Sequence, residues 1–205
     1  MKPYTTISTT ASFEYEDRKS VFIGIASPVS TERDALDFIE AVKKRYPDAR
    51  HHVYAYVLRE NSTARFSDDH EPQGTAGLPT LDVIKKKDCT DVAIVVTRYF
   101  GGTLLGTGGL VRAYTAAAVG ALENAGIVRY DIYSEYELRM TYSDHVKVSA
   151  ILSDSGFRVT ETLYTDEVAL NGSIVSSESE PFEKKLTEIT SGRIKIEKKG
   201  EKFDY

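Results

Sequence analysis

The chain from Val92 to Gly126 reads VAIVVTRY, FGGTLLGTGG and LVRAYTAAAVGALENAG, in three parts that begin at residues 92, 100 and 110. The unbroken β-branched content of the first part predicts a buried strand over Ala93–Thr97. The third part predicts a helix over Leu110–Ala125, closed by Gly126. The middle part therefore joins a strand to a helix and places five glycines in nine residues just before the helix.

This glycine-rich connection is suited to holding a phosphate or a carboxylate. Glycine permits positive φ and close backbone approach, and a helix N-terminus presents free N–H groups. Arg98 and Arg112 flank the loop, and each can complete an anion site with a bidentate guanidinium. The glycines of this candidate site are Gly101, Gly102, Gly106, Gly108 and Gly109. The alternative is a turn that only packs the helix against a sheet, because neither a Walker A spacing nor a dinucleotide fingerprint is present.

A second polar segment, residues 67–77, reads SDDHEPQGTAG. Its three carboxylates and one imidazole can bind a divalent cation or act as general acid and base. The same residue types build loops and helix caps, with Thr75 or Glu71 near the start of the next helix. Of the adjacent His51 and His52, at most one can face this segment, because neighbouring strand residues point to opposite faces. We predict no metal and no cofactor, since spacing alone shows no converging ligands.

The rest of the N-terminal part alternates short strands with helices. One helix follows Ser30 or Thr31, either of which can cap it, and ends at Pro47. The other predicted elements are strands at residues 4–6, 13–18, 21–27, 53–58 and 127–130, a polar loop at 61–74 and a helix at 78–86.

The C-terminal part predicts six elements in the order βαββαβ, which is the order of a ferredoxin-like split βαβ sandwich. Gly156 and Gly192 stand where the two helices should end. The predicted elements are strands at residues 136–142, 157–164, 168–175 and 194–196, one helix after Ser143-Asp144 and another at 180–190.

Composition excludes several classes of protein. With 205 residues and 41% hydrophobic residues the chain can build one or two cores, and its net charge of −5 argues against bulk electrostatic binding to nucleic acid. The longest aliphatic run is five residues, and no apolar signal region follows Met1, so we expect a cytoplasmic protein with no membrane partner. The single Cys89 can form neither an internal disulfide nor a multi-thiolate metal site.

Residues 68–77, 95–102 and 105–114 together closely resemble the motifs of the YigZ/IMPACT family, and His51 matches the histidine that precedes a strand in that family. The resemblance covers essentially the whole chain, with an IMPACT-type N-terminal domain over residues 1–131 and the small C-terminal domain of bacterial members over 136–205. The positions that it marks as the family motif surface are His51, Asp68, Asp69, Glu71, Pro72, Thr75, Gly77 and Tyr99. The chain departs at His70, where the family usually has glycine.

The resemblance implies an α+β fold, in which a ribosomal protein S5 domain 2-like α/β sandwich precedes a ferredoxin-like βαββαβ domain. Both domains are similar to domains of elongation factor G. Eukaryotic members regulate translation under stress by competing for an activator of an initiation-factor kinase. Bacterial members have no established reaction, and their association with nucleic acid or the ribosome is inferred from fold, which is an analogy.

Three functions remain open. The leading hypothesis is a non-catalytic, translation-associated regulatory protein that binds RNA, the ribosome or a translation-related protein partner through the glycine loop, Arg98 and Arg112, with Lys85 and Lys86 alongside. The alternative is an enzyme or sensor acting on a phosphorylated small molecule or nucleotide, in which residues such as Asp68 and His51 place a metal or move a proton. The third is a module that only binds proteins.

Overall fold

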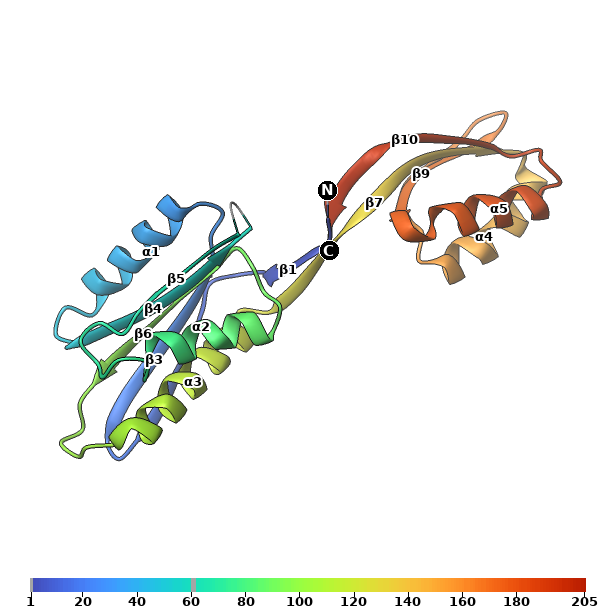
Figure 1. Cartoon of the computed structure of the whole chain (residues 1–205). Helices are drawn as coiled ribbons and strands as arrows, with labels where there is room; N and C mark the ends of the chain where they lie inside the picture. The colour runs from blue at the N-terminus through green and yellow to red at the C-terminus, as the bar shows by residue number, and fades with distance from the viewer. Residues whose placement is uncertain (1, 60–61) are drawn as a thin grey trace. The chain divides into compact units, whose positions relative to one another are not determined.

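The computed structural model describes residues 2–59 and 62–205. The chain divides into two compact units, an N-terminal unit of Tyr4–Arg129 and a C-terminal unit that contains Tyr130–Tyr205 (Figure 1). The boundary lies within one long strand, β7 (Ile127–Met140). Each unit has its own buried apolar core, so each is described separately.

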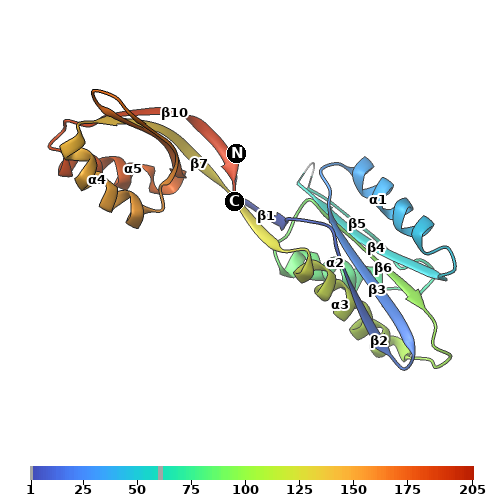
Figure 2. The same cartoon turned by 180° about the vertical axis from the view of Figure 1, so that it is seen from behind.

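The N-terminal unit is a five-stranded antiparallel sheet between two layers of helix. The strand order is β2-β3-β6-β4-β5, which places the apolar strand β6 at the centre. Helix α1 covers one face of the sheet, and α2 and α3 cover the other (Figures 1 and 2). The elements are β1 (Tyr4–Ile7), β2 (Ala11–Asp17), β3 (Ser20–Pro28), α1 (Glu32–Arg45), β4 (His51–Leu58), β5 (Thr63–Ser67), α2 (Gly77–Lys86), β6 (Val92–Tyr99) and α3 (Gly106–Asn124).

Strand β6 is buried on both faces because the two helical layers share it. Ile94 and Val96 point into the core beneath α2 and α3, whereas Ala93 and Val95 point into the core beneath α1. This alternation explains the unbroken apolar sequence, since a strand covered on both sides has no solvent-facing position. Arg98 continues the series of Ile94 and Val96, so its side chain enters the sheet face covered by α3.

Helix α1 confirms its sequence prediction. Thr31 is the N-cap, and its side chain and the Asp34 carboxylate bond each other's backbone N–H in a capping box. Ala35, Ile39 and Val42 form the buried stripe that packs on the sheet. The helix ends at Arg45, two residues before Pro47.

The predicted polar loop over residues 61–74 is wrong in part, because residues 63–67 form strand β5; Asn61, where that loop was to begin, lies outside the described residues. Strand β5 pairs with β4 and is the outer strand of the sheet. It is half-exposed over most of its length, so its sequence carries too little apolar alternation to indicate a strand. The two strands predicted at residues 127–130 and 136–142 are one continuous strand, β7.

The C-terminal unit has the predicted βαββαβ order. Its sheet contains β7, β9 and β8 in that order, and β10 and β1 both pair with the long strand β7. Both helices bury their apolar residues against one face (Figure 2). Gly156 has a positive φ at the C-cap of α4, as expected. The elements after β7 are α4 (Tyr142–Ser155), β8 (Arg158–Tyr164), β9 (Val168–Val175), the short 3₁₀ turn Ser176–Glu178, α5 (Ser179–Ile189) and β10 (Lys195–Asp204). The predicted fold class, an α/β sandwich followed by a ferredoxin-like unit, is confirmed.

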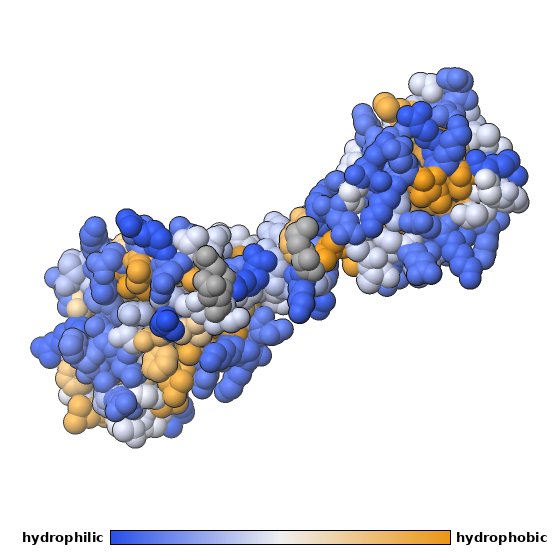
Figure 3. Space-filling model, turned by 45° about the horizontal axis from the view of Figure 1, so that its top comes forward, coloured by the Kyte–Doolittle hydropathy of each residue, from blue (hydrophilic) through white to orange (hydrophobic). Residues whose placement is uncertain are grey.

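On the face shown in Figure 3, both units are mostly hydrophilic, with hydrophobic areas between the polar residues. None of the helices in the described part of the chain combines the length and the apolar character that a membrane span needs. Cys89 is buried, and burial raises the pKa of its thiol to about 11. The thiol is therefore held in its unreactive protonated form at neutral pH.

Candidate functional site

A buried cluster of polar side chains lies at the end of β6. Oε1 of Glu71 accepts a hydrogen bond from Nη1 of Arg98 at 2.5 Å and another from the hydroxyl of Tyr114 at 2.7 Å. The side chains of Arg98 and Glu71 are only 6% and 4% exposed, so the carboxylate and the guanidinium are almost completely withdrawn from water. Three separate segments supply the cluster, because Glu71 lies before α2, Arg98 on β6 and Tyr114 on α3.

The sheet register explains why these residues meet. Arg98 pairs with Phe22 on β3 and with His51 on β4, so the three side chains share the face that α3 covers. Tyr114 packs edge-on against the ring of Phe22 at 5.1 Å, and the guanidinium of Arg98 lies 5.4 Å from the same ring. Burial, followed by the neighbouring Glu71 carboxylate, raises the pKa of Tyr114, which keeps its hydroxyl protonated as a donor.

His51 joins the edge of this cluster. Its Nδ1 lies 2.8 Å from the carbonyl oxygen of Asp69, so Nδ1 carries the proton and donates it. Its Nε2 lies 4.0 Å from Oε1 of Glu71. His52 faces the other way, with Nε2 3.0 Å from the carbonyl oxygen of Tyr46, as strand alternation predicts.

The two aspartates before the cluster hold the loop together. Asp68 accepts backbone hydrogen bonds from Gly74, Ala76 and Gly77, and so caps the N-terminus of α2. Asp69 accepts the backbone N–H of His52 at 2.6 Å. The cap predicted at Thr75 or Glu71 is therefore wrong, because Asp68 bonds the free N–H groups from outside the helix.

The remaining predicted motif residues lie in or beside the same loop. The hydroxyl of Thr75 donates to the carbonyl oxygen of Pro72 at 2.6 Å. Gly77 has no room for a side chain, since a Cβ there would lie 2.6 Å from the carbonyl oxygen of Ser67. Tyr99, which follows Arg98 on β6, is half-buried. Among residues 2–59 and 62–205 no group of three or more His, Cys, Asp or Glu side chains is placed to hold a metal ion.

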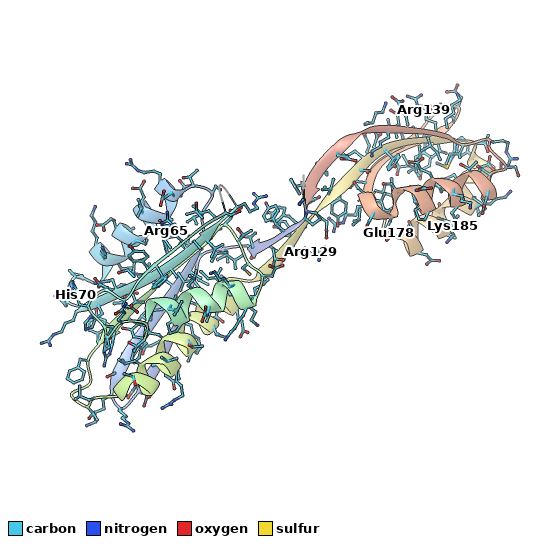
Figure 4. All side chains as sticks on the ribbon, viewed as in Figure 1. Arg65, His70, Arg129, Arg139, Glu178 and Lys185 are labelled. Atoms are coloured by element: carbon cyan, nitrogen blue, oxygen red, sulfur yellow. The ribbon has the colours of Figure 1, made fainter. Side chains whose placement is uncertain are left out.

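His70 occupies a position that favours glycine. Asp69 and His70 have φ values of 40° and 68°, and the turn is closed by the N–H of Glu71 donating to the carbonyl oxygen of Asp68 at 2.9 Å. Figure 4 labels His70 at this turn. The turn therefore requires two consecutive left-handed residues, which explains glycine as the family's usual residue.

We expect His70→Gly to raise the free energy of unfolding of the N-terminal unit by about 0.5–1 kcal/mol. The left-handed conformation costs an L-residue about 1–2 kcal/mol, and glycine recovers this at the expense of some unfolded-chain entropy. Thermal unfolding of the full chain, with hydrogen exchange of peptides over residues 66–77, measures the change. His70→Ala keeps the strain and is the control. If His70→Gly were less stable than His70→Ala, backbone strain would not govern the stability of this turn.

The glycine loop differs in part from its prediction. Helix α3 begins at Gly106 rather than Leu110, so Gly106, Gly108 and Gly109 belong to its first turn, and only Gly101 and Gly102 lie in the connection. Packing of the later turns against the sheet offsets the low helix propensity of these glycines. The N-cap residue Leu105 has no side-chain capping bond, and the first turn has no acidic residue.

Basic side chains that the sequence reasoning missed lie beside this uncapped helix end. Arg18 and Lys19 form the two-residue turn between β2 and β3, and Nη1 of Arg18 donates to the carbonyl oxygen of Leu104 at 3.3 Å. A Cβ on Gly101 would lie only 2.1 Å from the carbonyl carbon of Lys19, so glycine permits this close approach. The sequence gives no signal for this turn, because two-residue hairpin turns favour Asn-Gly or Asp-Gly; the pairing of Asp17 with Ser20 in the structure establishes it.

The structure separates the predicted anion-binding residues into three places. Arg112 is exposed in the early part of α3, near the glycine loop, whereas Arg98 is buried with Glu71. Lys85 and Lys86 are in the last turn of α2, whose next residue, Lys87, pairs with Glu123 in the last turn of α3. About 25 Å of helix separates that end of α3 from the glycine loop. The two lysines are thus not brought to the loop.

Comparison with known proteins finds relatives along most of the chain. The Impact N-terminal domain matches residues 18–122, and a domain of unknown function, DUF1949, matches residues 138–193. The IMPACT family member YvyE of Bacillus subtilis is 38% identical over 97% of this chain and 91% of its own length. The IMPACT family member YigZ of Escherichia coli is 33% identical over 88% of this chain and 90% of its own length.

A solved structure described as the crystal structure of an hypothetical protein matches with a TM-score of 0.61 and 31% identity, covering 96% of this chain and 97% of that one. The Saccharomyces cerevisiae protein IMPACT homolog is 31% identical over 47% of this chain and 39% of its own length. The domain matches and the identity to the bacterial relatives agree, and they place this chain in the IMPACT family.

Proposed function

We propose that this protein is a translation-associated regulatory protein that binds ribosomal RNA through one surface of its N-terminal unit. We call this surface the glycine-loop surface and define it by Arg18, Lys19, residues 100–106 and Arg112. The observation that carries the proposal is the uncapped N-terminus of α3 beside three basic side chains. Free N–H groups and guanidinium or ammonium groups are the donors that proteins use for phosphate oxygens.

The turn between β2 and β3 supports this proposal independently. Arg18 and Lys19 have φ values of 47° and 64°, and a two-residue turn of this kind strongly favours Asn-Gly. Positive φ values at two long basic residues lower the stability of the fold. Strained backbone of this kind is concentrated at binding and active sites. The exposed Leu104 and half-exposed Phe100 add apolar surface beside these charges.

Because the chain is acidic overall, any binding to RNA must depend on contacts at the glycine-loop surface itself. With a net charge of −5, long-range attraction to RNA is weak, and affinity depends on a few direct phosphate contacts. Each contact releases bound counterions, so the logarithm of the affinity falls with the logarithm of salt concentration by about 0.7–0.9 per phosphate. A surface with three basic residues therefore predicts a shallow but measurable salt dependence.

Co-sedimentation of the full chain with purified ribosomes across a salt series tests the proposal. We expect the protein to pellet with ribosomes at low salt, and the Lys19→Ala/Arg112→Ala variant to bind about tenfold more weakly with a salt slope reduced by about 2. The Lys44→Ala/Lys184→Ala variant removes the same charge from exposed sites elsewhere and should bind as the unmodified chain does.

Two results would count against RNA binding by this surface. One is failure of the unmodified chain to pellet at any salt concentration. The other is equal loss of binding in the two double variants, which would indicate a dependence on net charge alone. If binding is lost only in the first variant but does not depend on salt, the surface contacts a ribosomal protein rather than RNA phosphates.

A further inference from the structure

We propose that a second site, which shares only Phe100 with the glycine-loop surface, binds the oxyanion of a small ligand. The site is a pocket of about 220 Å³ lined by Asp48, Arg50, Arg98, Tyr99 and Phe100. It lies where the connection between α1 and β4 meets the end of β6. Its volume is below the roughly 300–1,000 Å³ typical of sites for drug-sized molecules, which suits a phosphate or carboxylate group.

Arg98 supplies the main argument. Its guanidinium uses Nη1 for Glu71, while its buried Nε has no hydrogen-bond partner among the residues that the structure describes. Buried polar groups in proteins are almost always satisfied, so the unpaired Nε of a side chain that lines a pocket is a reason to place a ligand group beside this guanidinium. Nη2 lies on the same edge of the guanidinium as Nε, it is hydrogen-bonded to none of the described residues, and it is the donor that an oxygen of a carboxylate or phosphate would accept from.

The other lining residues complete a suitable environment. Arg50 and Asp48 are both exposed, and neither forms an ion pair within the described parts of the chain. Glu71 already neutralises the charge of Arg98, so Arg50 supplies the positive charge that attracts an anion. The guanidinium of Arg98 is fixed over the ring of Phe100 at 5.6 Å, so the donor is held in place before a ligand arrives.

Asp48 and Arg50 have opposite charges, so substituting each of them should change the anion affinity of the site in opposite directions. Its carboxylate lines the same pocket and repels an anion, whereas Arg50 attracts one. Replacing the two residues must therefore change anion affinity in opposite directions if the anion binds here. Both side chains are exposed, so neither substitution should disturb the fold.

The experiment is a titration of the isotopically labelled full chain, followed by amide chemical shifts at constant ionic strength. Inorganic phosphate and acetate are the two probes, and chloride is the reference anion. We expect saturable shifts at residues 48–50 and 98–100, with the stronger of the two probes identifying phosphate or carboxylate as the natural group. Arg50→Ala should weaken binding about fivefold and Asp48→Asn should strengthen it about threefold, while Lys44→Ala, which lies outside the pocket, should have no effect.

Three outcomes would overturn the site. These are linear shifts with both probes, saturable shifts confined to residues 101–108, and changes of the same sign in Arg50→Ala and Asp48→Asn. The Arg112→Ala variant keeps every residue of the pocket, so it should bind the probe normally. Loss of ribosome binding with intact anion binding, or the reverse, therefore distinguishes failure of one proposal from failure of the other.

Discussion

Replacing Arg98 by methionine is expected to lower the free energy of unfolding of the N-terminal unit by about 3–5 kcal/mol. The Glu71 carboxylate would keep its place in a nearly dry environment but lose the charge that balances it. The hydroxyl of Tyr114 would still donate to Glu71, yet one neutral donor does not replace a guanidinium. Urea unfolding of the full chain, followed by hydrogen exchange of peptides from each unit, measures this loss. Peptides from the C-terminal unit provide the internal reference.

Removal of the whole cluster should cost much less than removal of its cation. In the triple variant Arg98→Met/Glu71→Leu/Tyr114→Phe no buried charge or unpaired hydroxyl remains, and apolar groups fill similar volumes. We expect this variant to recover most of the stability that Arg98→Met loses, so the effects of the substitutions are strongly non-additive. Additive losses would show that the three side chains do not act as a unit.

Gly24→Ala is expected to destabilise the same unit by about 3 kcal/mol, at the upper end of overpacking effects. A Cβ at Gly24 would lie 2.3 Å from the carbonyl oxygen of Ala117 and 2.8 Å from its carbonyl carbon. Both atoms belong to the backbone of α3, so no side-chain rotation relieves the contact, and the helix must move away from β3. Because α3 also carries Tyr114 and Arg112, the movement should disturb the buried cluster and the glycine-loop surface together.

Gly108→Ala is the matched control for this prediction. Gly108 lies in the first turn of α3, where a Cβ would meet only the guanidinium of Arg112 at 3.6 Å. The substitution should raise stability by about 0.5–1 kcal/mol, because alanine favours the helix more than glycine does. The two variants are compared by thermal unfolding and by hydrogen exchange in peptides from α3. Equal effects would contradict the role of the Gly24 contact.

The elements with strong local signals could be predicted from the sequence. Helix α1 has a capping box and a clear apolar stripe, and β6 has an unbroken β-branched core, so each appears where the pattern indicates. Strand β5 and the start of α3 could not be predicted in the same way. Strand β5 forms because the edge of β4 offers hydrogen bonds, and Gly106–Gly109 are helical because the rest of α3 packs on the sheet.

The candidate site residues divide along the same line. The glycine loop and the segment 67–77 are each an unbroken stretch of sequence. Their residue types therefore identify them as candidates and carry the resemblance to the IMPACT family. The partnership of Glu71, Arg98 and Tyr114 joins segments that are 27 and 43 residues apart, and only the sheet register and the packing of α3 bring them together. The approach of Lys19 to Gly101 has the same origin.

The sequence by itself therefore determined most of the helices and strands and the segments rich in polar groups, but not strand β5 or the continuity of β7. The features that it determined depend on local periodicity and turn chemistry, which neighbouring residues are sufficient to specify. The tertiary structure decided which of the polar groups are buried and paired, as with Arg98, and which remain exposed, as with Arg112. Burial and charge pairing depend on contacts between distant segments, and the free energy of those contacts has no counterpart in the local pattern.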